Sequence, residues 1–367
     1  MQAREILGVT QTDLALALGV TQSAVAHIEA GRVFPSDELM ARLSTETPFP
    51  AAFYGRRPCE HFPMGSLQFR ARKKMTMAQR RQAYQYARLS YEMFEDISRG
   101  VMMPPVRIRP HDGEPERLAE QVRAMLGVSD QAPIANLTLL LERAGIVVLA
   151  LPIALPERDG FSGWADGGRV PVIVMPRHRH GDRGRFTMAH ELGELLYAAL
   201  PPGDERERKA DEFASNLMLP PQAIRREFSG GSVTLTSLAM GKRRWKMSMA
   251  ALAMATKRLG VVSDRHYRTL VQHMAAKGWK TAEPAALAVV PEKPRALRKA
   301  IELKYGEAPN YPKMARDLGL SVFMLREIVS AYASKADLAG VKGVASSPIT
   351  NLHWREGWDG EPDDRRR

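Results

Sequence analysis

Residues 185–200 have the sequence RFTMAHELGELLYAAL, which predicts a helix and carries more potential chemistry than any other segment of the chain. His190 and Glu194 are four residues apart, so they share one face of such a helix. Glu191 directly follows His190. In the H-E-x-x-H pattern, two histidines at this spacing bind zinc, and the glutamate after the first is the general base for a metal-bound water. Glu194 stands here in the place of the second histidine.

The flanking sequence predicts a small sheet before this helix and a second helix after it. Strands are expected at 146–152, 161–166 and 170–176, and Asp166-Gly167-Gly168 is a hairpin-turn sequence between the last two. The second helix contains residues 207–214, where Glu207 is placed to supply a third metal ligand.

Residues 137–225 resemble the ImmA/IrrE family of metallo-endopeptidases. The matching features are the Phe161-Ser162-Gly163-Trp164 strand, the Pro-Val-Ile-Val strand, Arg185-Phe186-Thr187-x-Ala189-His190-Glu191-Leu192-Gly193, and Glu207-x-x-Ala210-Asp211-x-Phe213-Ala214 followed by Leu219-Pro220. The resemblance implies an α+β zincin-like domain with Zn²⁺ as cofactor. It places the metal positions at His190, Glu194 and Glu207, and the catalytic base at Glu191. Members of this family commonly cleave a partner repressor.

Glu194 is the departure from the family pattern, which has histidine there. A carboxylate binds zinc, so a His/Glu/Glu site with one water is chemically possible, although two anionic ligands would weaken the pull of the ion on the water proton. One alternative is a site without metal, in which the glutamates face solvent or basic neighbours. Another is replacement of the ligand by His178 or His180 from the preceding loop. We expect weak, chelator-sensitive zinc binding, slow or absent proteolysis, and tighter binding after Glu194→His.

Residues 10–36, TQTDLALALGVTQSAVAHIEAGRVFPS, predict two short helices joined by a sharp turn. Gly19 lies at the turn, which requires a residue that tolerates positive φ, and Thr21 is a suitable N-cap for the second helix. Val25 and Ile28 point back into a small core. A helix-turn-helix of this kind places its second helix in the major groove of DNA.

The outward side chains of that second helix are candidate DNA contacts. They include Gln22, Ser23 and His27, and glutamine can form two hydrogen bonds with adenine. Thr21 and Gln11 complete the expected DNA-binding set, with Gln11 in contact with phosphate.

The same segment resembles the Xre-type (Cro/CI-like) helix-turn-helix family, including its Glu29-x-Gly31 and Pro35-Ser36 features. Before it, residues 2–7 supply a first helix of under two turns, which is marginal without packing. Either the start codon lies upstream, or the truncated helix weakens the domain.

A second helix-turn-helix-like pair is predicted near the C-terminus, where Ala315, Gly319, Leu320, Ser321, Leu325 and Ile328 repeat the spacing of the first. Val322 and Phe323 stand where Gln22 and Ser23 face the bases, so packing inside the domain or at a dimer interface is favoured over DNA contact. One helix-turn-helix reads few base pairs, and a homodimer is therefore expected. The helix at 322–329 and the aromatic helix at 84–94 are its candidate interfaces.

Composition sets limits on the class of protein. The chain has 367 residues, 44% of them hydrophobic, which suits two or three globular domains. Mean hydropathy is −0.29, and no apolar run approaches the roughly 20 residues that span a bilayer. The single Cys59 excludes an internal disulfide, the N-terminus lacks a signal-peptide pattern, and we expect a cytoplasmic protein. The net charge of +12 favours a polyanionic partner, with basic clusters at 56–88 and 242–246.

These features predict a mainly α protein with a small α+β domain. We expect a helix-turn-helix domain at 1–46, a linker arm and helical connector at 47–130, an ImmA/IrrE-like peptidase domain at 131–225, a helical region with the second pair at 226–340, and a partly disordered tail at 341–367. The predicted function is a transcriptional regulator that binds a double-stranded DNA operator and whose zinc-peptidase-like domain senses or transmits a signal. The alternatives are an active zinc endopeptidase that cleaves a partner repressor or itself, and a toxin–antitoxin or phage-defence component that uses DNA binding for autoregulation.

Overall fold

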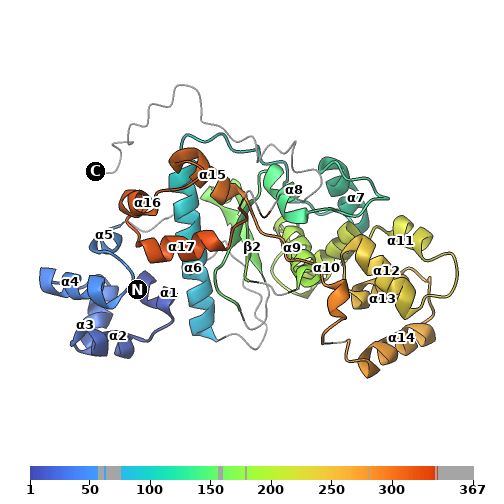
Figure 1. Ribbon diagram of the computed structural model, residues 1–367, viewed down its shortest axis with the longest axis horizontal. Helices are drawn as coiled ribbons and strands as arrows, with labels where there is room; N and C mark the ends of the chain where they lie inside the picture. Colours follow the sequence, from blue (N-terminus) through green and yellow to red (C-terminus); the bar gives the residue numbers. More distant parts are fainter. Residues whose placement is uncertain are drawn as a thin grey trace.

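The computed structural model describes residues 1–56, 62, 76–155, 160–177, 180–279, 281–334 and 337. Cys59, His178 and the tail at 341–367 lie outside these residues. Within the described chain, seventeen α-helices accompany one three-stranded sheet (Figure 1). This confirms a mainly α protein with a small α+β part. No described helix is long and apolar enough to cross a membrane.

The first four helices form an N-terminal unit: α1 (Gln2–Leu7), α2 (Gln11–Leu18), α3 (Gln22–Glu29) and α4 (Asp37–Glu46). α2 begins with a capping box in which Thr10 and Asp13 bond each other's backbone amides. Gly19 ends α2 in the left-handed conformation, with φ of 66°. Thr21 then caps α3 by accepting a hydrogen bond from the Ala24 amide at 3.2 Å. The structure therefore contains the predicted helix-turn-helix.

The short helix α1 is held by packing against α6 (Met77–Ser98). The Gln82 side-chain amide donates to the backbone oxygen of Ile6 at 2.9 Å. The Gln85 amide donates to the Glu5 carboxylate at 2.7 Å in a buried contact. Tertiary contacts thus stabilise a helix of six residues that would fray in isolation.

Aromatic side chains bury one side of α6. The single-turn helix α5 (Ala51–Tyr54) follows α4, and beyond it Phe62 stacks on Tyr84 and Tyr91 with ring centroids 5.9 and 4.9 Å apart. Tyr84, Tyr91 and Phe94 are all buried within the chain. The expectation that this aromatic face forms a dimer interface is therefore wrong, because the chain itself covers it.

The sheet has the strand order β1-β3-β2, formed by β1 (Val147–Ala150), β2 (Phe161–Ala165) and β3 (Val170–Met175). β1 and β3 are parallel, whereas β2 and β3 are antiparallel and joined by the predicted turn, η2 (Asp166–Gly168). Side chains alternate along β3, so Val172 and Val174 face the core around α6 while Ile173 and Met175 face a second core. The sheet separates the two cores.

Eight helices build the second core: α7 (Pro115–Met125), α8 (Leu137–Arg143), α9 (Gly181–Leu196), α10 (Asp204–Met218), α11 (Pro221–Glu227), α12 (Leu235–Trp245), α13 (Met249–Arg258) and α14 (Asp264–Ala276). In Figure 1, α9 and α10 lie between the sheet and the group formed by α11 to α14. The predicted motif helices are therefore central to the molecule.

The chain then returns past η3 (Ala285–Leu287) to α15 (Ala296–Tyr305), α16 (Tyr311–Leu318) and α17 (Val322–Ser330), which join the core around α6 (Figure 1). Gly319 links α16 to α17 with φ of 59°, as in the first helix-turn-helix. Leu325 and Ile328 of α17 are fully buried, so this pair packs inside the chain as predicted. Among the large apolar residues of α17, Phe323 differs from Leu325 and Ile328, because 63% of its surface is exposed.

Candidate metal centre and nucleic-acid interface

Small residues let α9 and α10 approach closely at the motif. A Cβ atom on Gly193 would lie 2.9 Å from the Cα of Ala210 and 3.1 Å from the ring of Phe213. Ala210 and Phe213 are fully buried in the contact. The glycine and alanine of the two motif segments therefore bring the polar residues of both helices to one point.

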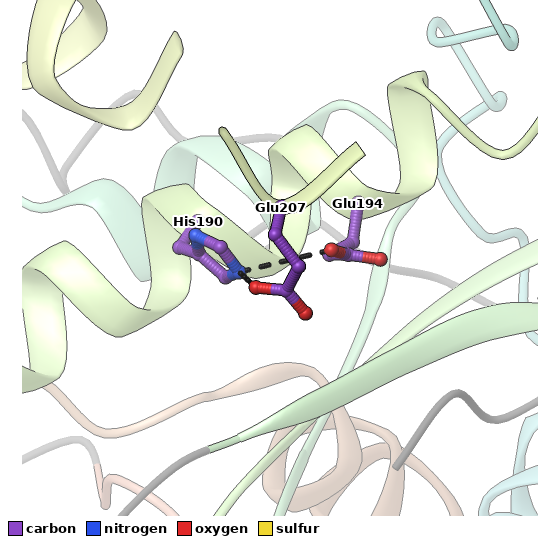
Figure 2. A group of neighbouring side chains, drawn as sticks. All are labelled: His190, Glu194 and Glu207. Atoms are coloured by element: carbon purple, nitrogen blue, oxygen red, sulfur yellow. Dashed lines mark ion pairs between the residues drawn. The ribbon is translucent and has the colours of Figure 1, made fainter. Parts of the chain in front are cut away.

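Three predicted ligands meet at this point. His190 Nε2 lies 3.8 Å from Glu194 Oε1 and 3.7 Å from Glu207 Oε2, and all three donor atoms lie within 4.8 Å of one another. Figure 2 shows the three side chains converging from the two helices. His190 and Glu194 are buried, whereas 35% of the Glu207 side chain is exposed. The structure thus brings together the ligand set predicted from spacing.

The donor set fits a zinc ion. Zinc bonds of about 2.0–2.2 Å in a tetrahedral arrangement place neighbouring ligand atoms roughly 3.4 Å apart. The two distances from His190 exceed that value by only a few tenths of an ångström, and the two carboxylate oxygens lie within 4.8 Å of each other. One nitrogen and two carboxylate oxygens are also donors that zinc accepts.

Asp211 orients the histidine. Its Oδ1 lies 2.8 Å from His190 Nδ1, which leaves Nε2 facing the two glutamates. A carboxylate on the far nitrogen is the usual partner of a metal-binding histidine, since it fixes the ring and raises its basicity. Asp211 follows Glu207 by four residues on α10, and that spacing was the available sequence signal for placing both on one face.

Glu191, the predicted base, lies on the strand side of α9. Ser162 of β2 places its hydroxyl 2.9 Å from Glu191 Oε2 and 3.0 Å from the Glu191 backbone oxygen. Both residues are buried. On sequence grounds Ser162 was only part of a predicted strand, and nothing in its spacing indicated this contact.

Arg206 is a second site residue, besides Ser162, that the sequence did not indicate. Its Nε lies 2.8 Å from Glu194 Oε2, and its Nη2 donates to the Glu194 backbone oxygen at 2.5 Å. Arg206 itself is only 4% exposed. It directly precedes Glu207 in a run of alternating charges, which on sequence grounds indicates only a solvated helix face.

The loop histidines do not complete the site in the described structure. His180 is exposed at the start of α9, ten residues before His190. At 1.5 Å per residue, these two positions are about 15 Å apart along the helix. His178 lies outside the described residues.

The second predicted site is the outward face of α3. Thr21, Gln22, Ser23 and His27 are exposed, whereas Val25 is buried. Gln22 Nε2 donates to Gln11 Oε1 at 2.7 Å, so these two predicted DNA contacts form one surface. The exposed face of α3 therefore presents polar side chains that can form hydrogen bonds with base edges in the major groove.

An ion-pair network fixes α3 behind this surface. Glu29 accepts hydrogen bonds from Arg4 at 2.8 and 3.0 Å and from Gln11 at 2.8 Å. Burial alone would raise the pKa of Glu29, but these hydrogen bonds and the charges of the Met1 amino group and Arg4 lower it to about 2. α1, α2 and α3 are therefore tied together at one partly buried carboxylate.

The basic cluster at 242–246 is divided between the interior and the surface. Lys242 is buried between Asp182 and Glu283. Arg243, Arg244 and Lys246 are exposed, although Arg244 pairs with Glu227 at 2.8 Å and the Lys246 ammonium donates to the Ala135 backbone oxygen at 2.9 Å. Lys242 is therefore not part of a basic surface.

Together, the fold and these contacts define a helix-turn-helix protein with a metallopeptidase-like body. Residues 1–50 match the helix-turn-helix family model, and residues 141–257 match the model of the IrrE N-terminal-like domain, a peptidase family. No curated protein matches the chain. Residues 1–50 are therefore similar to Xre-type helix-turn-helix domains, and residues 141–257 are similar to ImmA/IrrE-like domains.

Proposed function

We propose that the protein is a sequence-specific transcriptional regulator whose ImmA/IrrE-like domain binds zinc and transmits a signal to the DNA-binding unit. The observation that carries the proposal is the exposed α3 face, with Gln22, Ser23 and His27 outward and Gln11 beside them. A braced helix with polar residues at these positions is suited to the major groove. Such a regulator works where the DNA lies, in the cytoplasm.

We propose that the metal centre mainly binds zinc and contributes little or no peptidase activity. His190, Glu194 and Glu207 would hold the ion, and Asp211 would orient His190. A bound zinc would supply a Lewis acid and an activated water. The two glutamates weaken that activation, so turnover is expected to be slow or absent.

Peptidase activity is the second candidate, and the position of Glu191 favours it. The Glu191 carboxylate is held by Ser162 next to His190, where it can accept a proton. An active enzyme would cleave a partner repressor or the chain itself. Cleavage of a co-encoded repressor by the purified protein, lost in Glu191→Gln, would establish this alternative.

The test of DNA binding is an electrophoretic shift with the promoter of the protein's own gene. Gln22→Ala should reduce sequence preference and cost about 1–3 kcal/mol if the contact to adenine is bidentate. Gln272→Ala, at an exposed position on α14, is the matched control and should bind like wild type. Equal loss in both variants, or no shifted fragment at low salt, would refute the proposal.

Homodimerisation is part of the proposal, because paired half-sites about one DNA turn apart compensate for the few base pairs read by one unit. Of the two predicted interfaces, only α17 presents an exposed large apolar side chain, Phe323.

A further inference from the structure

Glu194 and Arg206 form an ion pair inside the candidate metal centre. The guanidinium group contacts one oxygen of Glu194 at 2.8 Å and the backbone oxygen of the same residue at 2.5 Å. The other carboxylate oxygen, Oε1, faces His190 Nε2 at 3.8 Å. Arg206 therefore holds the carboxylate in the orientation in which one oxygen points to the metal position.

Arg206 also changes the charge of the site. The affinity of a buried site for a dication depends on the net charge of the groups around it. One histidine and two glutamates carry two negative charges, whereas the family pattern of two histidines and one glutamate carries one. With the Arg206 guanidinium included, the three ligands of this chain also carry one net negative charge, and Asp211 belongs to both patterns, so it does not change the comparison.

We propose that Arg206 is a positioning and charge-compensating residue, so that Glu194 and Arg206 act as one unit in place of a neutral histidine ligand. This inference rests on the proposed metal binding by His190, Glu194 and Glu207. It revises the expectation that Glu194→His alone tightens zinc binding. The substitution adds a neutral ligand, but it also leaves a buried guanidinium without its carboxylate beside the ion, which is unfavourable.

The test is a double-mutant cycle on the full chain, with Zn²⁺ affinity measured by titration calorimetry. The variants are Glu194→His, Arg206→Met and the two together; methionine has a similar length and no charge. Glu194→His should bind zinc no more tightly than wild type. In the Arg206→Met background the same substitution should tighten binding about tenfold or more, the scale on which groups that support metal ligands act.

Two further variants separate this role from a purely structural one. Arg206 also contacts backbone oxygens near the end of α9, so its loss affects packing as well as charge. Arg206→Lys keeps the charge, and Glu194→His should still give no gain in that background. Glu194→Gln keeps the shape but leaves the charge of Arg206 without its carboxylate, and it should bind zinc about tenfold more weakly than wild type. The comparison in the Arg206→Lys background decides the question even if Arg206→Met does not fold.

The outcomes are distinct. An equal gain from Glu194→His in all three Arg206 backgrounds, or a tenfold gain from Glu194→His alone, would overturn the role of Arg206 while leaving the metal site intact. Zinc binding by none of the variants would overturn both this inference and the proposed metal site. The DNA-binding part of the proposed function would still be measured separately on the wild-type protein.

Discussion

Glu29→Gln tests how the DNA-binding unit is held together. Glutamine has nearly the same shape as glutamate but cannot carry the charge that pairs with Arg4. The pKa of Glu29 is about 2, against a usual value of 4.5. At about 1.4 kcal/mol per pKa unit, this difference amounts to roughly 3 kcal/mol, which solvent screening at the edge of the unit reduces to about 1–2 kcal/mol.

The pH dependence gives the prediction its sign. A lowered pKa stabilises the folded state above the unfolded value near 4.5, and this contribution is lost as the pH falls towards the folded value of about 2. The difference in stability between wild type and Glu29→Gln should therefore be full at pH 6 and near zero at pH 2.

Native-state hydrogen exchange of peptides from α2 and α3 measures this local stability without unfolding the whole chain. Glu38→Gln is the control, because Glu38 is 76% exposed in a surface pair with Arg42 and should contribute little. A Glu29→Gln effect no larger than that of the control at pH 6, or one of equal size at pH 2, would refute the reasoning.

Three more predictions concern the body of the protein. Gly193→Ala should lower the free energy of unfolding by about 1–3 kcal/mol, because its Cβ would lie 2.9 Å from the Cα of Ala210. Gly230→Ala is the control and should be nearly neutral, since a Cβ there has no neighbour within 4 Å. Similar melting curves for the two variants would contradict the close approach of α9 and α10. Burial raises the pKa of Glu142 to about 7, so its contribution to stability should be lost as pH rises from about 4.5 through 7. Glu142→Gln should remove that loss, and melting temperatures at pH 5 and 8.5 that shift in parallel for both proteins would contradict it. Phe323→Glu should convert the proposed dimer to a monomer in light scattering, and an unchanged mass would exclude α17 as the interface.

Local signals explain what was predicted correctly from the sequence. The turn at Gly19, the cap at Thr21, and the hairpin at residues 166–168 all depend on residues close together in the chain. Such conformational preferences act over a few residues and need no knowledge of the remaining fold. The same reasoning placed His190 and Glu194 on one helix face.

Contacts between distant segments explain what was not predicted. The aromatic pattern of α6 predicted a dimer interface, whereas the chain's own Phe62 and C-terminal helices cover this face. The basic cluster at 242–246 indicated a charged surface, whereas Lys242 is buried between two carboxylates from other segments.

For this protein, the sequence by itself determined the helix-turn-helix, the three strands with their turn, and the helix that carries His190 and Glu194, because period, capping and motif spacing are local properties. The tertiary structure alone decided which charges meet. Asp211 contacts His190, and Arg206 contacts Glu194, only because Gly193 and Ala210 allow α9 and α10 to pack so closely. The partner of a buried charge is set by the packing of two helices, and neither helix specifies that contact alone.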